Sequence, residues 1–107
     1  MTPRKVRYSK TFVDRLLDYT DLGEIKYGER LAQEKKRLVF ALLDDTIALT
    51  PAIKRRHSKL GLVVYSISGT PFIVIYDYDD EEIRVMSCFL RGAGDRIEDF
   101  DPADVEW

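Results

Sequence analysis

Three apolar runs in the C-terminal half of the chain have the composition of β-strands. They cover residues 62–68, 72–78 and 83–90, and they are rich in β-branched and aromatic side chains, which suit a pleated, half-buried surface. The connections between them, residues 68–71 and 79–81, are short and contain the glycine, proline and acidic residues typical of turns. Because connections this short cannot carry a parallel crossover, the pattern predicts an antiparallel meander of three strands.

The N-terminal half is predicted to form a short strand and two amphipathic helices. Residues 6–8 alternate apolar and charged side chains, and Ser9 is a suitable N-cap for the helix that follows them. We expect this helix to end at Gly23, because glycine is favoured just beyond a helix C-terminus, and a second helix to cover residues 24–43. Gly28 would then allow the second helix to approach the first closely.

The buried faces of the two helices follow from the helical spacing of their apolar residues. The expected buried positions are Phe12, Val13, Leu16, Leu17, Tyr19, Ile25, Leu31, Ala32, Leu38, Val39, Leu42 and Leu43. Two such helices joined by a short turn form a hairpin that buries its apolar side against a sheet. The sequence therefore predicts an α+β fold: a small antiparallel sheet, made of the short N-terminal strand and the meander, with the helical hairpin packed on one face.

The 107 residues are expected to form one domain, with its core over about residues 4–96 and an acidic tail over residues 97–107. Phe100 and Trp107 are the large apolar side chains of the tail. Two alternatives remain open for this segment: it packs on the body of the protein, or it stays mobile until a partner orders it.

Composition indicates a soluble, cytoplasmic protein. Apolar residues make up 45% and charged residues 34% of the chain, no apolar run approaches the roughly 20 residues of a membrane helix, and no hydrophobic signal segment follows the N-terminus. Cys88 is the single cysteine, which excludes an intrachain disulfide and a cysteine-based zinc site, and its place on a predicted strand indicates a buried thiol. We expect no metal, no cofactor and no membrane partner.

The net charge of −2 conceals separate basic and acidic segments. Basic residues gather in residues 4–10, 35–37 and 54–59, whereas acidic residues gather in residues 77–82 and 98–106. Because positive and negative residues are nearly equal in number, the net charge neither favours nor excludes a nucleic-acid partner. The evidence for such a partner must come from the local charged segments.

The order of elements and two sequence blocks resemble the RelE/ParE family of bacterial type II toxins. The blocks are Val6-Arg7-Tyr8-Ser9 and residues 72–95, FIVIYDYDDEEIRVMSCFLRGAGD. In ParE-type members the second block typically closes with His-Gly-x-x-Asp, where this chain has Arg91-Gly92-Ala93-Gly94-Asp95. Residues 62–65 lack the arginine that usually begins that strand. The resemblance covers about residues 4–96 and implies the α+β fold predicted above.

The resemblance also implies a toxin that arrests growth unless a cognate, ParD-like antitoxin binds it in a hetero-oligomer. In the ParE-like interpretation the toxin inhibits DNA gyrase by binding, so it needs a shaped, charged surface rather than catalytic groups. The implied contacts with the target are Arg84, Arg91, Gly92 and Arg96. The expected contacts with the antitoxin are Tyr19 and Tyr27 on the hairpin, and Lys54, Arg55, Arg56 and Lys59 on the basic loop.

Two alternatives stand beside this interpretation. A RelE-like, ribosome-dependent mRNA endoribonuclease would need cations for the charged phosphorane and a group that moves protons, and Arg84, Arg91, His57 and Lys54 are the candidates. His57 is a weak signal, because a lone histidine in a basic loop is usually only solvated. An inactive, toxin-like interaction module is the other alternative. The shortage of nuclease groups favours the gyrase-binding interpretation.

Overall fold

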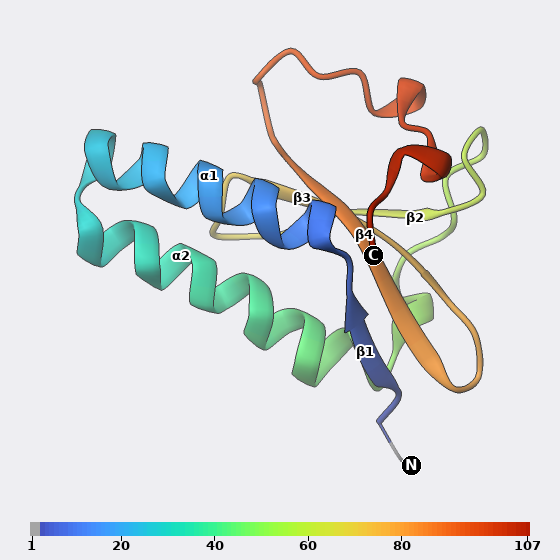
Figure 1. The fold of residues 1–107 in the computed structure, drawn as a ribbon. Coiled ribbons are helices and arrows are strands. Elements are labelled where there is room, and N and C mark those ends of the chain that lie inside the picture. The colour runs from blue at the N-terminus through green and yellow to red at the C-terminus, as the bar shows by residue number, and fades with distance from the viewer. Residues whose placement is uncertain (1–2) are drawn as a thin grey trace.

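The computed structural model describes residues 3–107, in which a pair of long helices packs on a four-stranded sheet (Figure 1). The elements are β1 (Lys5–Tyr8), α1 (Lys10–Tyr27), α2 (Glu29–Ala41), β2 (Val63–Ser66), β3 (Phe72–Tyr78) and β4 (Glu82–Leu90). A π-helical segment (Leu42–Ile47) continues α2, and 3-10 turns occur at Pro51–Ile53, Ile97–Asp99 and Pro102–Asp104. The predicted α+β class is confirmed.

The sheet has the strand order β1-β4-β3-β2. As predicted, β2, β3 and β4 form an antiparallel meander. Strand β1 instead lies parallel to β4, with Val6 opposite Ile83, so the sheet is mixed rather than wholly antiparallel. A parallel neighbour is available to β1 because the whole helical hairpin separates it from the meander in sequence, which leaves enough chain for a crossover.

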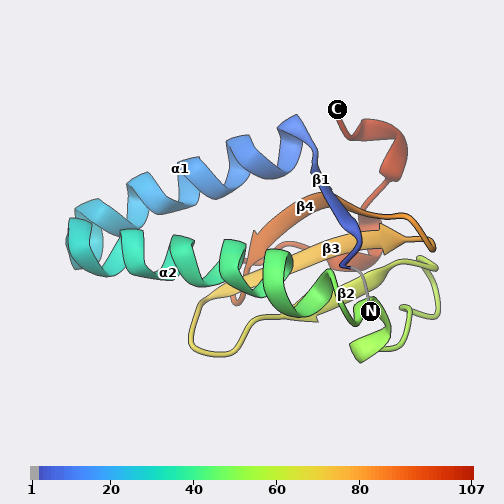
Figure 2. The ribbon, with the colours of Figure 1, turned by 90° about the horizontal axis from the view of Figure 1, so that it is seen from below.

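Helices α1 and α2 cover one face of the sheet, and the main core lies between the two layers (Figure 2). Phe12 from α1, Val39 from α2 and Val85 from β4 are fully buried in it. Ser9 begins α1 as predicted, since its Oγ accepts a hydrogen bond from the Phe12 N–H at 2.8 Å. The Ser9 hydroxyl also donates to the Met86 carbonyl at 2.6 Å, which ties the start of the hairpin to β4.

The prediction that the first helix ends at Gly23 is wrong. Helix α1 continues through Gly23 to Tyr27, and the turn to α2 is made by Gly28, which has a φ of 94°. Gly23 instead lies where the helices approach closely, because a Cβ there would be 3.6 Å from the Cβ of Ala32. The roles expected of Gly23 and Gly28 are therefore exchanged.

The longer α1 also changes which apolar side chains are buried. The tip of the hairpin projects beyond the sheet (Figure 1), so Ile25, which was expected in the core, is 85% exposed. Leu17, Leu31 and Leu38 are also exposed rather than buried, whereas Ala32 is buried as expected. The helices therefore contribute a smaller core than their apolar content suggests and leave apolar groups on the surface.

A second, smaller apolar cluster is built from Leu62, Ile75 and Phe89. Ile97 and Phe100 of the tail pack against this cluster, so the tail lies on the body of the protein. Cys88 is buried, as predicted from its strand. No helix within residues 3–107 combines the length and the apolar character needed to cross a bilayer.

Candidate partner-binding groove

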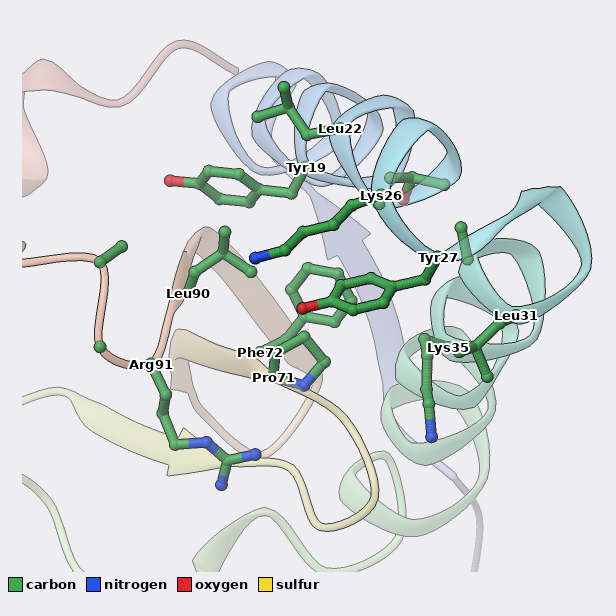
Figure 3. A pocket seen from close by; sticks show the side chains of 15 residues that line it. Tyr19, Leu22, Lys26, Tyr27, Leu31, Lys35, Pro71, Phe72, Leu90 and Arg91 are labelled. Carbon is green, nitrogen blue, oxygen red and sulfur yellow. The ribbon is translucent and has the colours of Figure 1, made fainter.

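A cavity of about 600 Å³ lies between the tip of the helical hairpin and one end of the sheet (Figure 3). One wall comes from the last turns of α1 and the first turn of α2, and the other comes from the ends of β3 and β4 with the turn that follows β4. We call this cavity the hairpin groove. The residues that line it include Tyr19, Lys26, Tyr27, Leu31, Lys35, Phe72 and Arg91.

The hairpin wall presents aromatic groups to solvent. Tyr27 is 64% exposed, whereas the ring of Tyr19 is partly buried and packs on Phe72 with 6.4 Å between the ring centroids. The Lys26 ammonium lies 5.3 Å from the centroid of the Tyr27 ring and extends into the groove (Figure 3). Across the turn the Gln33 amide donates to the Glu24 carboxylate at 2.6 Å, which fixes the helices at this wall.

The opposite wall is held by hydrogen bonds of the loop before β3. The Thr70 hydroxyl donates to the Ile67 carbonyl at 3.0 Å and accepts from the Phe72 N–H at 3.1 Å. The Arg91 N–H donates to the Pro71 carbonyl at 2.8 Å, so the turn after β4 is tied to this loop. The wall is thus preorganised around the turn that carries Arg91.

The groove is cationic as well as apolar. The Arg91 guanidinium donates to the Ser66 hydroxyl at 2.8 Å and to the Thr70 carbonyl, and it points toward β2 (Figure 3). Lys35 donates to the Gly69 carbonyl at 2.5 Å. These partners are neutral, and no carboxylate lines the groove within residues 3–107, so the positive charges of Lys26, Lys35 and Arg91 are not compensated there. The groove suits a partner with apolar anchors and acidic groups.

Arg84, a second of the three arginines expected in the target contact, lies in a different environment. It forms ion pairs with Asp79 at 2.8 Å, Glu82 at 2.9 Å and Asp77 at 3.5 Å. Hydrogen bonds to Asp79 and Glu82 raise the pKa of the Arg84 guanidinium, and the hydrogen bond from Arg84 is the main cause that lowers the pKa of Asp79 to about 2. Arg91 follows Arg84 by seven positions along extended backbone, which corresponds to roughly 23 Å. The structure therefore does not bring these two arginines together.

The basic loop divides into paired and unpaired cations. Arg56 forms an ion pair with Asp77 at 2.5 Å and stacks on Tyr78, with its Cζ 4.5 Å from the ring centroid. Lys54, Arg55 and Lys59 are exposed, and none of them forms an ion pair within the described part of the chain. Arg56 thus shares Asp77 with Arg84 and belongs to that charge network rather than to the hairpin groove.

His57, the candidate proton carrier, has a local structural role. Its Nδ1 accepts hydrogen bonds from the backbone N–H groups of Lys59 at 3.2 Å and Leu60 at 3.3 Å, which order the turn after it. Arg96 pairs with Asp99 at 3.5 Å and lies away from the groove, whereas Gly92, with a φ of 75°, lines it. The predicted site residues that meet in one place are therefore Tyr19, Tyr27, Arg91 and Gly92.

Sequence reasoning missed Leu22, Lys26 and Lys35 as groove residues. A signal for the first two was present, because Tyr19, Leu22 and Lys26 follow a helical three-and-four spacing. This spacing indicates a shared face only if the helix continues through Gly23. No pattern in the sequence indicates Lys35, because its position in the groove depends on its contact with the loop before β3.

Comparison with known proteins shows similarity to solved structures and not to known sequences. No family model matches the sequence, and no curated protein matches it. The fold is similar to that of a solved chain from the chromosomal ParDE TA system from P. aeruginosa, with a TM-score of 0.71 and 11% identity over 81% of this chain and 95% of that chain. At this identity the similarity shows a shared fold, which agrees with the fold implied by the sequence resemblance.

Proposed function

We propose that this chain is the toxin of a type II toxin–antitoxin system, that it inhibits DNA gyrase in a ParE-like manner, and that its antitoxin neutralises it by binding in the hairpin groove. The observation that carries the proposal is the groove itself, which is lined by exposed Tyr27 and by Arg91, an arginine without a carboxylate partner within residues 3–107. The fold shared with a chain of a ParDE TA system supports a toxin–antitoxin role in general.

The charge of the groove indicates the kind of antitoxin segment that it accepts. An amphipathic, acidic helix would place its apolar side chains against Tyr27 and Leu31 and its carboxylates near Lys26, Lys35 and Arg91. Such a segment would cover Arg91 and Gly92, which are the expected target contacts in the groove. Neutralisation would then follow from direct occlusion of the turn after β4.

The distribution of the nuclease candidates supports binding over cleavage. Arg84 is engaged with three carboxylates, and the Nδ1 atom of His57 is engaged with the backbone. Arg84 and Arg91 lie near opposite ends of β4. General acid–base catalysis on a phosphodiester needs its proton carrier and its cations within hydrogen-bond reach of one group.

The decisive experiment adds the purified chain, freed of antitoxin, to DNA gyrase with plasmid. Inhibited supercoiling with accumulation of cleaved plasmid is expected, and Arg91→Ala should abolish it whereas Arg30→Ala should not, since Arg30 does not line the groove. Unaffected gyrase together with cleavage of mRNA on translating ribosomes would overturn the proposal in favour of a nuclease.

Tyr27→Ala tests the antitoxin contact. The variant should bind the protein encoded beside this chain about 30-fold more weakly, the loss typical of a central aromatic anchor at an interface, about 2 kcal/mol. Its folding stability should change by less than about 0.5 kcal/mol, because the side chain is 64% exposed. The matched control is Ile25→Ala, which removes an exposed apolar side chain of the same helix outside the groove. Equal binding by both variants would refute the assigned site.

A further inference from the structure

The acidic tail covers a cationic part of the body. Residues 97–107 contain five carboxylates and no base, whereas residues 1–96 contain 17 bases and 14 acids. The tail thus changes the net charge of the chain from positive to negative. After the 3-10 turn at Pro102–Asp104 it returns to the start of α1, where the C-terminal end lies beside β1 and the first turn of α1 in both views (Figures 1 and 2).

Four contacts hold the end of the tail on the body. The Arg7 guanidinium lies 4.7 Å from the centroid of the Trp107 ring, and the Lys10 ammonium lies 3.7 Å from the Glu106 carboxylate. The Thr11 N–H donates to the Glu106 carbonyl at 3.2 Å, and the Glu106 N–H donates to the Thr11 hydroxyl at 2.8 Å. The backbone N–H and the carbonyl of Glu106 are thus both hydrogen-bonded to Thr11, and an ion pair and a cation–π contact flank them. Main-chain hydrogen bonds combined with side-chain contacts are the features by which proteins bind extended peptide segments.

A second anchor lies closer to the beginning of the tail. Phe100 meets Phe89 of β4 edge to face, with 6.2 Å between the ring centroids. The Arg15 guanidinium lies 4.8 Å from the centroid of the same Phe89 ring. The body thus supplies three cations, Arg7, Lys10 and Arg15, together with an aromatic platform beneath an acidic segment that carries two aromatic residues.

The tail fills this surface incompletely. A cavity of about 370 Å³ remains between the tail, α1 and β4. Ser87, which is fully buried, lines this cavity, and its hydroxyl is a buried side-chain group without a hydrogen-bond partner within residues 3–107. The surface therefore offers a hydrogen-bonding group that its present occupant does not use. The occupant is itself incompletely covered, since Trp107 keeps 45% of its surface exposed.

We propose that the surface formed by Arg7, Lys10, Thr11, Arg15 and Phe89, which we call the tail site, is a docking site for an acidic, aromatic-containing segment of a protein partner. The chain's own tail occupies this site and must leave when the partner binds. The exposed ion pair and the half-exposed Trp107 make release feasible, because such contacts are individually weak and are screened by salt. This site is separate from the hairpin groove and does not depend on the toxin assignment.

Trp107 provides a direct measurement, since it is the only tryptophan in the chain. Acrylamide quenching of its fluorescence is recorded for the full-length protein during titration with a synthetic peptide of residues 97–107 that carries Trp107→Phe. Because the tethered tail competes at an effective concentration of roughly millimolar, the titration extends to several times that value. We expect a saturable rise of about twofold in the quenching constant. The control peptide has the same sequence with every carboxylate replaced by its amide, and it should have no effect.

Variants of the full-length protein test the same contact without peptide. Arg7→Ala should raise the quenching of Trp107, Arg7→Lys should raise it less because a cation stays over the ring, and Arg30→Ala should leave it unchanged. Circular dichroism confirms that each variant is folded. Quenching that responds neither to the acidic peptide nor to high salt would overturn the proposal, because the tail would then be a permanent part of the fold. Equal displacement by the amide peptide, or displacement only by a single-stranded oligonucleotide, would also overturn it.

Discussion

The exchanged roles of Gly23 and Gly28 lead to a prediction with opposite signs at two positions. Gly28 joins the helices with a φ of 94° and a ψ of 153°, a conformation that is essentially restricted to glycine. Gly23 lies inside α1 with helical neighbours on both sides. Gly28→Ala should therefore destabilise the protein, whereas Gly23→Ala should stabilise it.

The structure sets the expected magnitudes. A side chain forced into the conformation of Gly28 costs about 1–3 kcal/mol of folding free energy. At Gly23 a new Cβ meets the Ala32 Cβ at 3.6 Å, which is an ordinary van der Waals contact. Replacing glycine by alanine in a helix interior then gains up to about 1 kcal/mol, because the unfolded chain loses backbone freedom and no clash opposes the gain.

Urea unfolding followed by circular dichroism measures both effects. The midpoint should fall for Gly28→Ala and rise for Gly23→Ala, with equal m-values, since neither change alters the surface exposed on unfolding. For a chain of this size 1 kcal/mol corresponds to about 4 °C in melting temperature. Gly28→Ala should also weaken the antitoxin binding proposed above, because Lys26 and Tyr27 are the last two residues of α1 before this turn.

The reverse pattern would refute the reasoning. If Gly23→Ala destabilised the protein while Gly28→Ala had no effect, the turn would lie at Gly23 and α1 would end there. The groove wall built by Tyr19 and Tyr27 would then not exist in the form described, and the assignment of the antitoxin site would fail with it.

Two further predictions concern buried and charged groups of the sheet. Tyr76→Phe should lower the free energy of unfolding by about 1–2 kcal/mol, because the buried Tyr76 hydroxyl donates a hydrogen bond to the buried Pro51 carbonyl at 2.7 Å. An unchanged urea midpoint would contradict this prediction. Stability should also fall as the pH drops from about 4 to about 2. Burial alone would raise the pKa of Asp77, but Arg56 and Arg84 lower it overall, and the pKa of Asp79 is about 2 against its usual 3.8. Because the pKa values of both carboxyl groups are lower in the folded than in the unfolded state, these groups stabilise the folded protein above pH 4, and this stabilisation is lost on acidification. Arg84→Ala should therefore make the urea midpoint less dependent on pH over this range.

The strands and the start of the first helix could be predicted from local sequence. Residues 72–78 and 83–90 were expected as strands, and β3 and β4 begin and end within one residue of these limits. Their β-branched and aromatic side chains and the short turns between them are local properties that act before any long-range contact forms. The same holds for Ser9, whose hydroxyl needs only the next turn of the chain to act as a cap.

The site could be predicted only in part. The sequence predicted Tyr19 and Tyr27 as contacts with the antitoxin and Arg91 and Gly92 as contacts with the target. In the structure all four line one groove. Their convergence depends on the length of α1, which the sequence leaves ambiguous because glycine is found both after helix ends and where helices pack closely.

The α+β class, the antiparallel meander, the cap at Ser9 and the burial of Cys88 could all be predicted from the sequence, because each follows from local propensity or from the alternation of apolar residues. The charge environment of the arginines required the folded structure. Arg84 is paired with carboxylates whereas Arg91 has no carboxylate partner within residues 3–107, since residues of the same type differ only in their neighbours in space. The folded structure was also required to establish the parallel pairing of β1 with β4 and the contact of the tail with Arg7. These contacts join segments far apart in the chain, and their free energy depends on which surfaces folding leaves uncovered.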